Sequence, residues 1–253
     1  MSNNIVAFIP ARGNSKTIYE KNLKLLGGKP LVAWSIESAQ HCGFERIIVN
    51  TEDSRIIEIA SQYNVFTQVR DQRLAGDNIS MYELLRSEIF KIDPVPDIVL
   101  LLQPTSPFRN HTFVNIALSY LFANLEKYDS LVSVEKVPDK YHPYAMILEN
   151  SPDKVILFRK LIGLKEKLVS RITGKKFVGP SLSGFSISQR ITRRQDMPQC
   201  WLPDGSIYIF KTENLKKGSL YGEKVMLLES EGTININSQE DWENAEQIIQ
   251  NKS

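Results

Sequence analysis

Short apolar runs alternate with amphipathic segments over the first half of the chain. The run at 5–9, IVAFI, is continuous and ends at Pro10, which is typical of a strand buried on both faces. The same pattern predicts further strands at 46–50, 97–102 and 130–135, with helices at 30–40, 54–63, 80–91 and 111–125. Strands that alternate with helices of this length predict right-handed β-α-β units around a mostly parallel sheet.

This rhythm changes after Val137. Residues 138–200 contain five prolines, scattered glycines and no regular alternation of strand and helix. Order returns with strands predicted at 205–210, 224–228 and 233–236, and with a final helix at 238–251, where Ser238 and Asp241 have the spacing of a capping box. We therefore expect one α/β domain, 1–253, with an inserted arm at about 138–200.

The composition is that of an ordinary globular protein. Of the 253 residues, 42% are hydrophobic and 24% are charged, which is enough apolar material for a sizeable core. No stretch approaches the roughly 18 apolar residues of a membrane span, and the N-terminus lacks the basic start and apolar run of a signal peptide. Cys42 and Cys200 are too few and too far apart for a zinc site or a disulfide framework. We therefore expect a cytoplasmic protein that does not bind a membrane.

Charge is nearly balanced over the whole chain but is clustered locally. The net charge is +2, so binding to nucleic acid has no overall electrostatic support. Basic residues gather in an early segment and in the predicted arm: Arg12, Lys16, Lys21, Lys24 and Lys29, and then Arg190, Arg193 and Arg194. Local basic patches on a balanced protein favour a small anionic ligand.

The segment 10–23, PARGNSKTIYEKNL, follows the first strand, at the place where open α/β sheets bind their ligands. Gly13 allows close approach of the backbone, and Asn14 and Ser15 supply short polar groups. The cations of the segment suit a polyphosphate, and they are Arg12, Lys16 and Lys21. A basic surface loop is the alternative interpretation, but a long charged loop directly after a buried strand is usually functional.

Two common phosphate-binding motifs do not fit this segment. Pro10 and Ser15 stand where a Walker loop needs glycines before Lys16-Thr17. Gly13 is the only glycine before Gly27, which argues against a dinucleotide-binding fingerprint.

The segment instead resembles the signature of the acylneuraminate (sialic acid) cytidylyltransferases, in which a strand leads into Pro-Ala-Arg-Gly-Gly-Ser-Lys and then Lys-Asn-Leu or Lys-Asn-Ile. Residues 10–16 match at every position except Asn14, which replaces the second glycine, and 21–23 match directly. Further segments resemble that family in order along the chain: 28–31, 49–53, 70 with 74–77 and 80, 102–109, 142–143, 194–198 and 204–209. Together with 10–16 and 21–23, these segments run in order from residue 10 to residue 209.

The resemblance implies both a fold and an activity. The implied fold is Rossmann-like, a three-layer α/β/α arrangement of the nucleotide-diphospho-sugar transferase type, whose inserted arm forms a homodimer. The implied activity is transfer of CMP from CTP to the anomeric hydroxyl of an acidic nine-carbon sugar, namely sialic, legionaminic or pseudaminic acid, with release of pyrophosphate. CTP and that sugar are the expected small-molecule partners.

The resemblance also implies roles for particular residues. The expected catalytic cations are Arg12, Lys16 and Lys21. The expected nucleotide-binding residues are Ala11, Arg12, Gly13, Asn14, Ser15, Lys16, Lys21, Asn22, Arg70 and Ser80. The expected sugar-binding residues are Gln103, Pro104, Thr105, Ser106, Arg190, Arg193, Arg194 and Gln195, with the arginines meeting the sugar carboxylate.

One position departs from the family pattern. The family carries Asp-Ile-Asp at the end of a late strand, where the aspartates bind Mg²⁺, whereas this chain has Asn235-Ile236-Asn237. Amide oxygens can coordinate Mg²⁺ but lack the charge that attracts it. Three accounts remain open: the triphosphate and water hold the metal, Asp241 or Glu240 helps to hold it, or catalysis is impaired.

Two alternative functions also remain open. The first is a cytidylyltransferase for an eight-carbon ulosonic acid or its amino variant, although those enzymes usually place an aspartate where this chain has 103–105. The second is a nucleotide-binding protein without catalysis, which the missing aspartate pair suggests.

Overall fold

The computed structural model describes residues 4–138, 141–142, 199–230 and 233–251. Contacts divide the chain into one compact unit made of Met1–Glu135 and Pro203–Ser253 and a second made of Lys136–Leu202. The second unit is described only at 136–138, 141–142 and 199–202. The four predicted sugar-binding residues of the arm lie outside the described residues, and they are Arg190, Arg193, Arg194 and Gln195.

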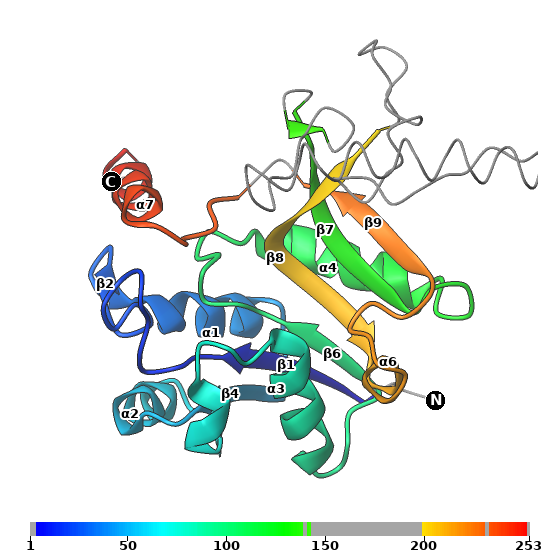
Figure 1. Cartoon of the computed structure of the whole chain (residues 1–253), viewed down its shortest axis with the longest axis horizontal. Coiled ribbons are helices and arrows are strands. Elements are labelled where there is room, and N and C mark those ends of the chain that lie inside the picture. The colour runs from blue at the N-terminus through cyan, green and yellow to red at the C-terminus, as the bar shows by residue number, and fades with distance from the viewer. Residues whose placement is uncertain (1–3, 139–140, 143–198, 231–232, 252–253) are drawn as a thin grey trace, which may run out of the picture. The chain divides into compact units, whose positions relative to one another are not determined.

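A seven-stranded sheet with the order β5-β4-β1-β6-β8-β7-β9 organises the fold (Figure 1). Its strands are β1 (Ile5–Pro10), β4 (Ile47–Thr51), β5 (Phe66–Val69), β6 (Ile98–Leu101), β7 (Ser130–Lys136), β8 (Trp201–Lys211) and β9 (Val225–Glu229). The central strand β1 pairs in parallel with β4 and β6, β4 pairs in parallel with β5, and β7 pairs in parallel with β9. Strand β8 differs, because it runs antiparallel to β6. The four parallel pairings make the sheet mostly parallel, as predicted.

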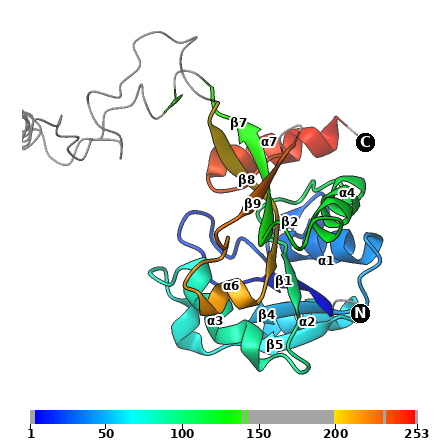
Figure 2. The same ribbon diagram turned by 90° about the vertical axis from the view of Figure 1, so that its right-hand side faces the viewer.

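Helices cover both faces of this sheet (Figure 2). The helices are α1 (Leu31–His41), α2 (Ser54–Gln62), α3 (Met81–Glu88), α4 (His111–Phe122), α6 (Glu213–Lys216) and α7 (Gln239–Gln250), with 3-10 turns at Gln72–Ala75 and Ile89–Lys91. One apolar cluster joins the sheet to α1, α2 and α4, and a second joins the opposite face to α3 and α6. The predicted three-layer α/β/α fold is therefore confirmed.

Strand β1 shows how the sequence pattern produces these layers. Ala7 and Ile9 belong to the cluster on one face, whereas Val6 and Phe8 belong to the cluster on the other. All four side chains are fully buried. A strand that is covered by helices on both sides must be apolar at every position, which explains the continuous run.

Short polar side chains cap four of the described helices, and in α4 the cap is Asn110, whose side chain accepts the backbone N–H of Thr112. The Asp53 carboxylate accepts the backbone N–H of Arg55 at the start of α2. Ser80 caps α3, and Ser238 caps α7 in the predicted capping box with Asp241. These caps satisfy backbone N–H groups that the first helical turn leaves without partners.

One predicted strand is absent from the structure, and one observed strand was not predicted. The predicted strand at 233–236 is not formed, because the Ile236 N–H donates to the Thr105 carbonyl at 2.7 Å instead of to a strand, and 233–237 form an irregular connection to α7. Strand β5 was not predicted, because this edge strand is mostly exposed and has no apolar run. A turn was correctly predicted at Gly27 and Gly28, which lie between the short strands β2 (Leu25–Leu26) and β3 (Lys29–Pro30) with positive φ angles.

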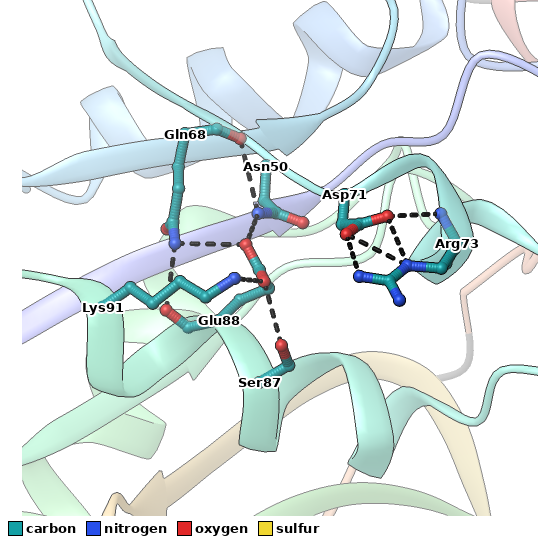
Figure 3. Close-up of polar contacts among 7 residues, drawn as sticks. All are labelled: Asn50, Gln68, Asp71, Arg73, Ser87, Glu88 and Lys91. Atoms are coloured by element: carbon teal, nitrogen blue, oxygen red, sulfur yellow. Dashed lines mark hydrogen bonds and ion pairs between the residues drawn. The ribbon is translucent and has the colours of Figure 1, made fainter.

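A buried carboxylate ties α3 to the two strands on the β4 side of the sheet (Figure 3). Glu88, at the end of α3, accepts hydrogen bonds from Asn50 of β4 at 3.0 Å and Gln68 of β5 at 3.2 Å, and it pairs with Lys91. Because the Glu88 side chain has no solvent exposure, these donors compensate for its loss of hydration. The network holds α3 against the sheet next to the pocket described below. Figure 3 also shows Arg73 paired with Asp71 at the surface of the neighbouring turn.

Within the described residues, no helix has the length and apolar character needed to cross a membrane.

Candidate functional site

A pocket of about 480 Å³ opens where the chain leaves strands β1, β5 and β6. Every residue that lines it belongs to the first compact unit. The lining residues are Pro10, Arg12, Ser15, Thr17, Lys21, Asn22, Arg70, Leu74, Gly76, Asp77, Ile79, Ser80, Met81, Leu84, Gln103, Pro104, Thr105 and Asn237. Pockets beyond the carboxyl ends of parallel strands are the usual ligand sites of open α/β sheets.

The pocket brings together residues that are far apart in the sequence. Of the predicted site residues, Arg12, Ser15, Lys21, Asn22, Arg70, Ser80, Gln103, Pro104, Thr105 and Asn237 line it. The others in the described part of the chain lie in the same segments without lining the pocket, and they are Ala11, Gly13, Asn14, Lys16, Ser106 and Asn235. The binding roles of both groups stay predictions.

Two of the predicted cations share one carboxylate. Asp77 pairs with Arg12 at 2.8 Å and with Lys16 at 2.9 Å. Hydrogen bonds from Lys16 and then Arg12 hold the pKa of Asp77 below its ordinary value. Asp77 therefore stands between the two cations in the way that an anionic ligand group would. Asp77 lies in a segment that resembles the family, but its contacts do not follow from the sequence, because its two partners lie more than sixty residues away.

Lys21 lines the same pocket and is less exposed to water than Lys16. Its ammonium group donates to the backbone carbonyl of Ile236 at 2.8 Å. Burial, followed by the nearby charge of Arg12, lowers the pKa of Lys21, and Asp241 acts in the opposite direction. A partly desolvated cation interacts with a developing negative charge more strongly than an exposed one, because less water screens the interaction.

Asn235 and Asn237 do not point into the pocket as a pair. Asn237 lines the pocket, whereas the Asn235 side chain packs against Gly205, where a Cβ atom would lie 2.2 Å from its Nδ2. The Asn235 Oδ1 atom is buried and finds no partner among the described residues. Within that same part of the chain, no group of three or more His, Cys, Asp and Glu side chains has the arrangement of a metal site. The two amides therefore do not fit a Mg²⁺ ion held by the protein alone, and the use of Mg²⁺ stays a prediction.

A buried arginine supports the side of the pocket formed by Gln103, Pro104 and Thr105, which is called the wall at 103–105 below. Arg109 donates to the Ser206 carbonyl at 2.6 Å and to the Gln103 carbonyl at 2.9 Å. Burial lowers the pKa of Arg109 to about 10, an effect that nearby Asp204 opposes. Ser106, whose hydroxyl donates to the Gly205 carbonyl at 3.1 Å, is buried beneath the same wall. The turn after β6 is thus tied to β8 by side chains that do not line the pocket.

Gly13 is required where it stands because Asp53, at the start of α2, approaches it closely. A Cβ atom at this position would lie 2.3 Å from the Asp53 Oδ2 and 2.8 Å from the Asp53 Cβ. We expect Gly13→Ala to lower the free energy of unfolding by about 1–3 kcal/mol through overpacking. Gly76→Ala is the matched control, because its nearest neighbour would be an ordinary contact at 3.5 Å. Thermal unfolding of both variants checks this, and equal Tm values would contradict the packing argument.

Comparison with known proteins identifies the family of this chain. A family model described as cytidylyltransferase matches residues 6–157, which include the segment 10–23 after β1 as well as β4, β6 and α4. The chain therefore belongs to the cytidylyltransferase family, which confirms the resemblance seen in its motifs.

Individual relatives agree with this assignment. The chain is 30% identical over 257 residues to the N-acylneuraminate cytidylyltransferase of Escherichia coli, covering 100% of this chain and 54% of the relative. It is 43% identical over 110 residues to the CMP-N,N'-diacetyllegionaminic acid synthase of Legionella pneumophila, covering 42% of this chain and 47% of the relative. The chain thus spans about half the length of these two curated relatives.

A solved structure supports the fold. The structure of CMP:2-keto-3-deoxy-manno-octonic acid synthetase complexed with CTP superimposes with a TM-score of 0.68, covering 99% of this chain and 100% of that one. The two sequences are 16% identical, so this likeness supports the architecture alone.

Proposed function

We propose that this chain is a CTP-dependent cytidylyltransferase that joins CMP to the anomeric hydroxyl of a nonulosonic acid and releases pyrophosphate. The observation that carries the proposal is the pocket at the ends of β1, β5 and β6, whose lining combines Arg12, Lys21 and Arg70 with the segment 103–105. Membership of the cytidylyltransferase family supports CTP as the nucleotide. The names of the two relatives support a sialic or a legionaminic acid as the acceptor, and we include pseudaminic acid because the sequence resemblance covers it.

The lining of the pocket divides it into three parts. Arg12 and Lys21 of the lining, with Lys16 beside them through its ion pair with Asp77, supply positive charge for the triphosphate. Asn22, Arg70 and Ser80 supply polar groups for the base and ribose. The wall at 103–105 then contacts the acceptor sugar. The arm residues Arg190, Arg193, Arg194 and Gln195 are proposed to complete the sugar site, and the arm is proposed to form a homodimer.

The proposed reaction needs alignment and charge stabilisation more than covalent chemistry. The anomeric oxygen forms a bond to the α-phosphorus, the bond to pyrophosphate breaks, and the hydroxyl proton is released. Negative charge grows on the α-phosphate and on the leaving group, so fixed cations lower the barrier. Lys21, held by the Ile236 carbonyl, is placed to meet this charge without first losing a full hydration shell.

Mg²⁺ is proposed to arrive with the triphosphate, because this ion is usually bound by substrate phosphates and water with few protein ligands. The neutral side chains of Asn235 and Asn237 favour a second candidate function, a protein that binds a nucleotide without turnover.

A pyrophosphate-release assay with CTP tests the proposed function. We expect release with at least one acid from a panel of sialic, legionaminic and pseudaminic acids. We also expect CTP at about 100 times its dissociation constant to add about 2.7 kcal/mol to the free energy of unfolding, which is measured as a rise in Tm. If pyrophosphate is released only with an eight-carbon ulosonic acid, then that acid is the acceptor and the proposed nine-carbon acceptor is wrong. A rise in Tm without release from any acid would support the non-catalytic candidate.

A further inference from the structure

One carboxylate, that of Glu52, connects the two nucleotide-facing parts of the pocket. Its Oε1 accepts the backbone N–H of Gly13 at 2.7 Å, and its Oε2 accepts the Arg70 Nε–H at 2.7 Å. The Glu52 and Arg70 side chains are only 8% and 3% exposed. Hydrogen bonds to an ionised and buried carboxylate are stronger and more selective in geometry than neutral ones at a surface.

The first of these bonds helps to hold a single peptide group from both ends. The Arg12 carbonyl accepts from the Asn22 side chain at 2.8 Å, and the N–H of the same peptide belongs to Gly13 and donates to Glu52. A planar peptide fixed at its carbonyl and at its N–H cannot rotate, although Gly13 itself has the freedom to do so. The Arg12 side chain therefore leaves the backbone in a fixed direction. The Gly13 N–H is also already engaged, so it is not a donor for a phosphate.

The second bond sets the direction of the Arg70 guanidinium. Its Nε is used by Glu52, whereas its Nη2 is buried and finds no acceptor among the described residues. A buried donor without a partner costs stability, and such groups in native structures usually have a partner that is supplied by a ligand or water. Because Arg70 lines the pocket, a ligand acceptor can complete this pairing.

The charges indicate which part of the nucleotide meets each group. Arg70 and Glu52 form a pair with no net charge, so this part of the pocket offers hydrogen-bond donors without an excess positive charge. Elsewhere in and beside the lining, the cations Arg12, Lys16 and Lys21 outnumber the single carboxylate of Asp77, which leaves a net positive charge. An uncharged base with carbonyl and ring-nitrogen acceptors matches the first environment, and a triphosphate matches the second.

We infer that Glu52 is a positioning residue that orients Arg70 toward the base and fixes the Arg12–Gly13 peptide, from which the Arg12 side chain reaches the phosphates. This inference rests on the proposed function, since it takes CTP to be the ligand of the pocket. An arginine with two donors in this orientation suits the O2 and N3 acceptors of cytosine, whereas uracil carries an N–H at position 3. Glu52 therefore contributes to the preference for CTP over UTP without touching the nucleotide.

The test compares Glu52→Gln with Glu58→Gln, an exposed glutamate of helix α2 that does not line the pocket. A glutamine has one acceptor oxygen and one donor nitrogen, so it cannot accept from both Gly13 and Arg70. Calorimetric titration with CTP and with UTP is expected to show CTP affinity at least about 10-fold weaker in Glu52→Gln and a smaller preference for CTP over UTP. Glu58→Gln is expected to retain both values.

The possible outcomes separate this inference from the proposed function. Failure of the wild-type chain to bind CTP would overturn the proposed function. Binding by the wild type with unchanged affinity and preference in Glu52→Gln would overturn the positioning role alone. An equal loss of CTP and UTP affinity would also overturn it, because that is the result of a merely structural brace. If Glu52→Gln does not fold, Glu52→Asp gives the same comparison, because it keeps both acceptor oxygens but shortens their reach.

Discussion

Turnover of the Lys21→Ala variant is expected to fall at least about 100-fold while the chain remains folded. Lys21 is partly buried in the pocket and held by the Ile236 carbonyl, so its charge acts in a poorly hydrated site. Removal of one well-placed donor from a site of this kind typically raises the barrier by about 2.7–4 kcal/mol. The measurement is the rate of pyrophosphate release at saturating CTP and sugar acid.

A matched control separates this effect from a general change in charge. Lys217→Ala removes an equal charge from an exposed side chain that pairs with Glu213 outside the pocket. That variant should keep the wild-type rate, and both variants should keep a Tm close to that of the wild type. A near-normal rate in Lys21→Ala would show that Lys21 has no catalytic role, even if the predicted fold is correct.

The Arg109→Met variant is expected to show the largest loss of stability. Arg109 is 6% exposed and donates to the carbonyls of Ser206 and Gln103, so its removal leaves buried acceptors unpaired and takes a counter-charge away from Asp204. Breaking a buried charged network of this kind typically costs about 3–5 kcal/mol, which corresponds to a fall in Tm of roughly 6–20 °C. Thermal unfolding followed by circular dichroism measures it.

Arg73→Met is the control for this prediction. Its side chain is 89% exposed and bonds to Asp71 two residues away, so water replaces the lost contacts (Figure 3). Its Tm should therefore stay close to that of the wild type. If Arg109→Met unfolds at the same temperature as Arg73→Met, then the wall at 103–105 does not depend on Arg109.

Patterns confined to one segment predicted local structure well. The continuous run at 5–9 became the central strand β1, because a strand covered on both faces can be recognised from its own residues. The capping box of Ser238 and Asp241 was recognised for the same reason, since both partners lie in one turn. Strand β5 was missed, because its four residues gain strand structure only from pairing with β4. The expected strand at 233–236 was wrong, because this segment bonds to the turn after β6.

The sequence by itself determined the α/β architecture, the position of the cationic loop after β1 and the family of the chain. Only the tertiary structure decided how the charges of the site are paired. Glu52 meets Gly13 across 39 positions, Asp77 meets Arg12 across 65, and Lys21 meets Ile236 across 215. The physical reason is that hydrophobic periodicity is carried by neighbouring residues, whereas a hydrogen bond between distant side chains exists only after the sheet has brought the ends of its strands together.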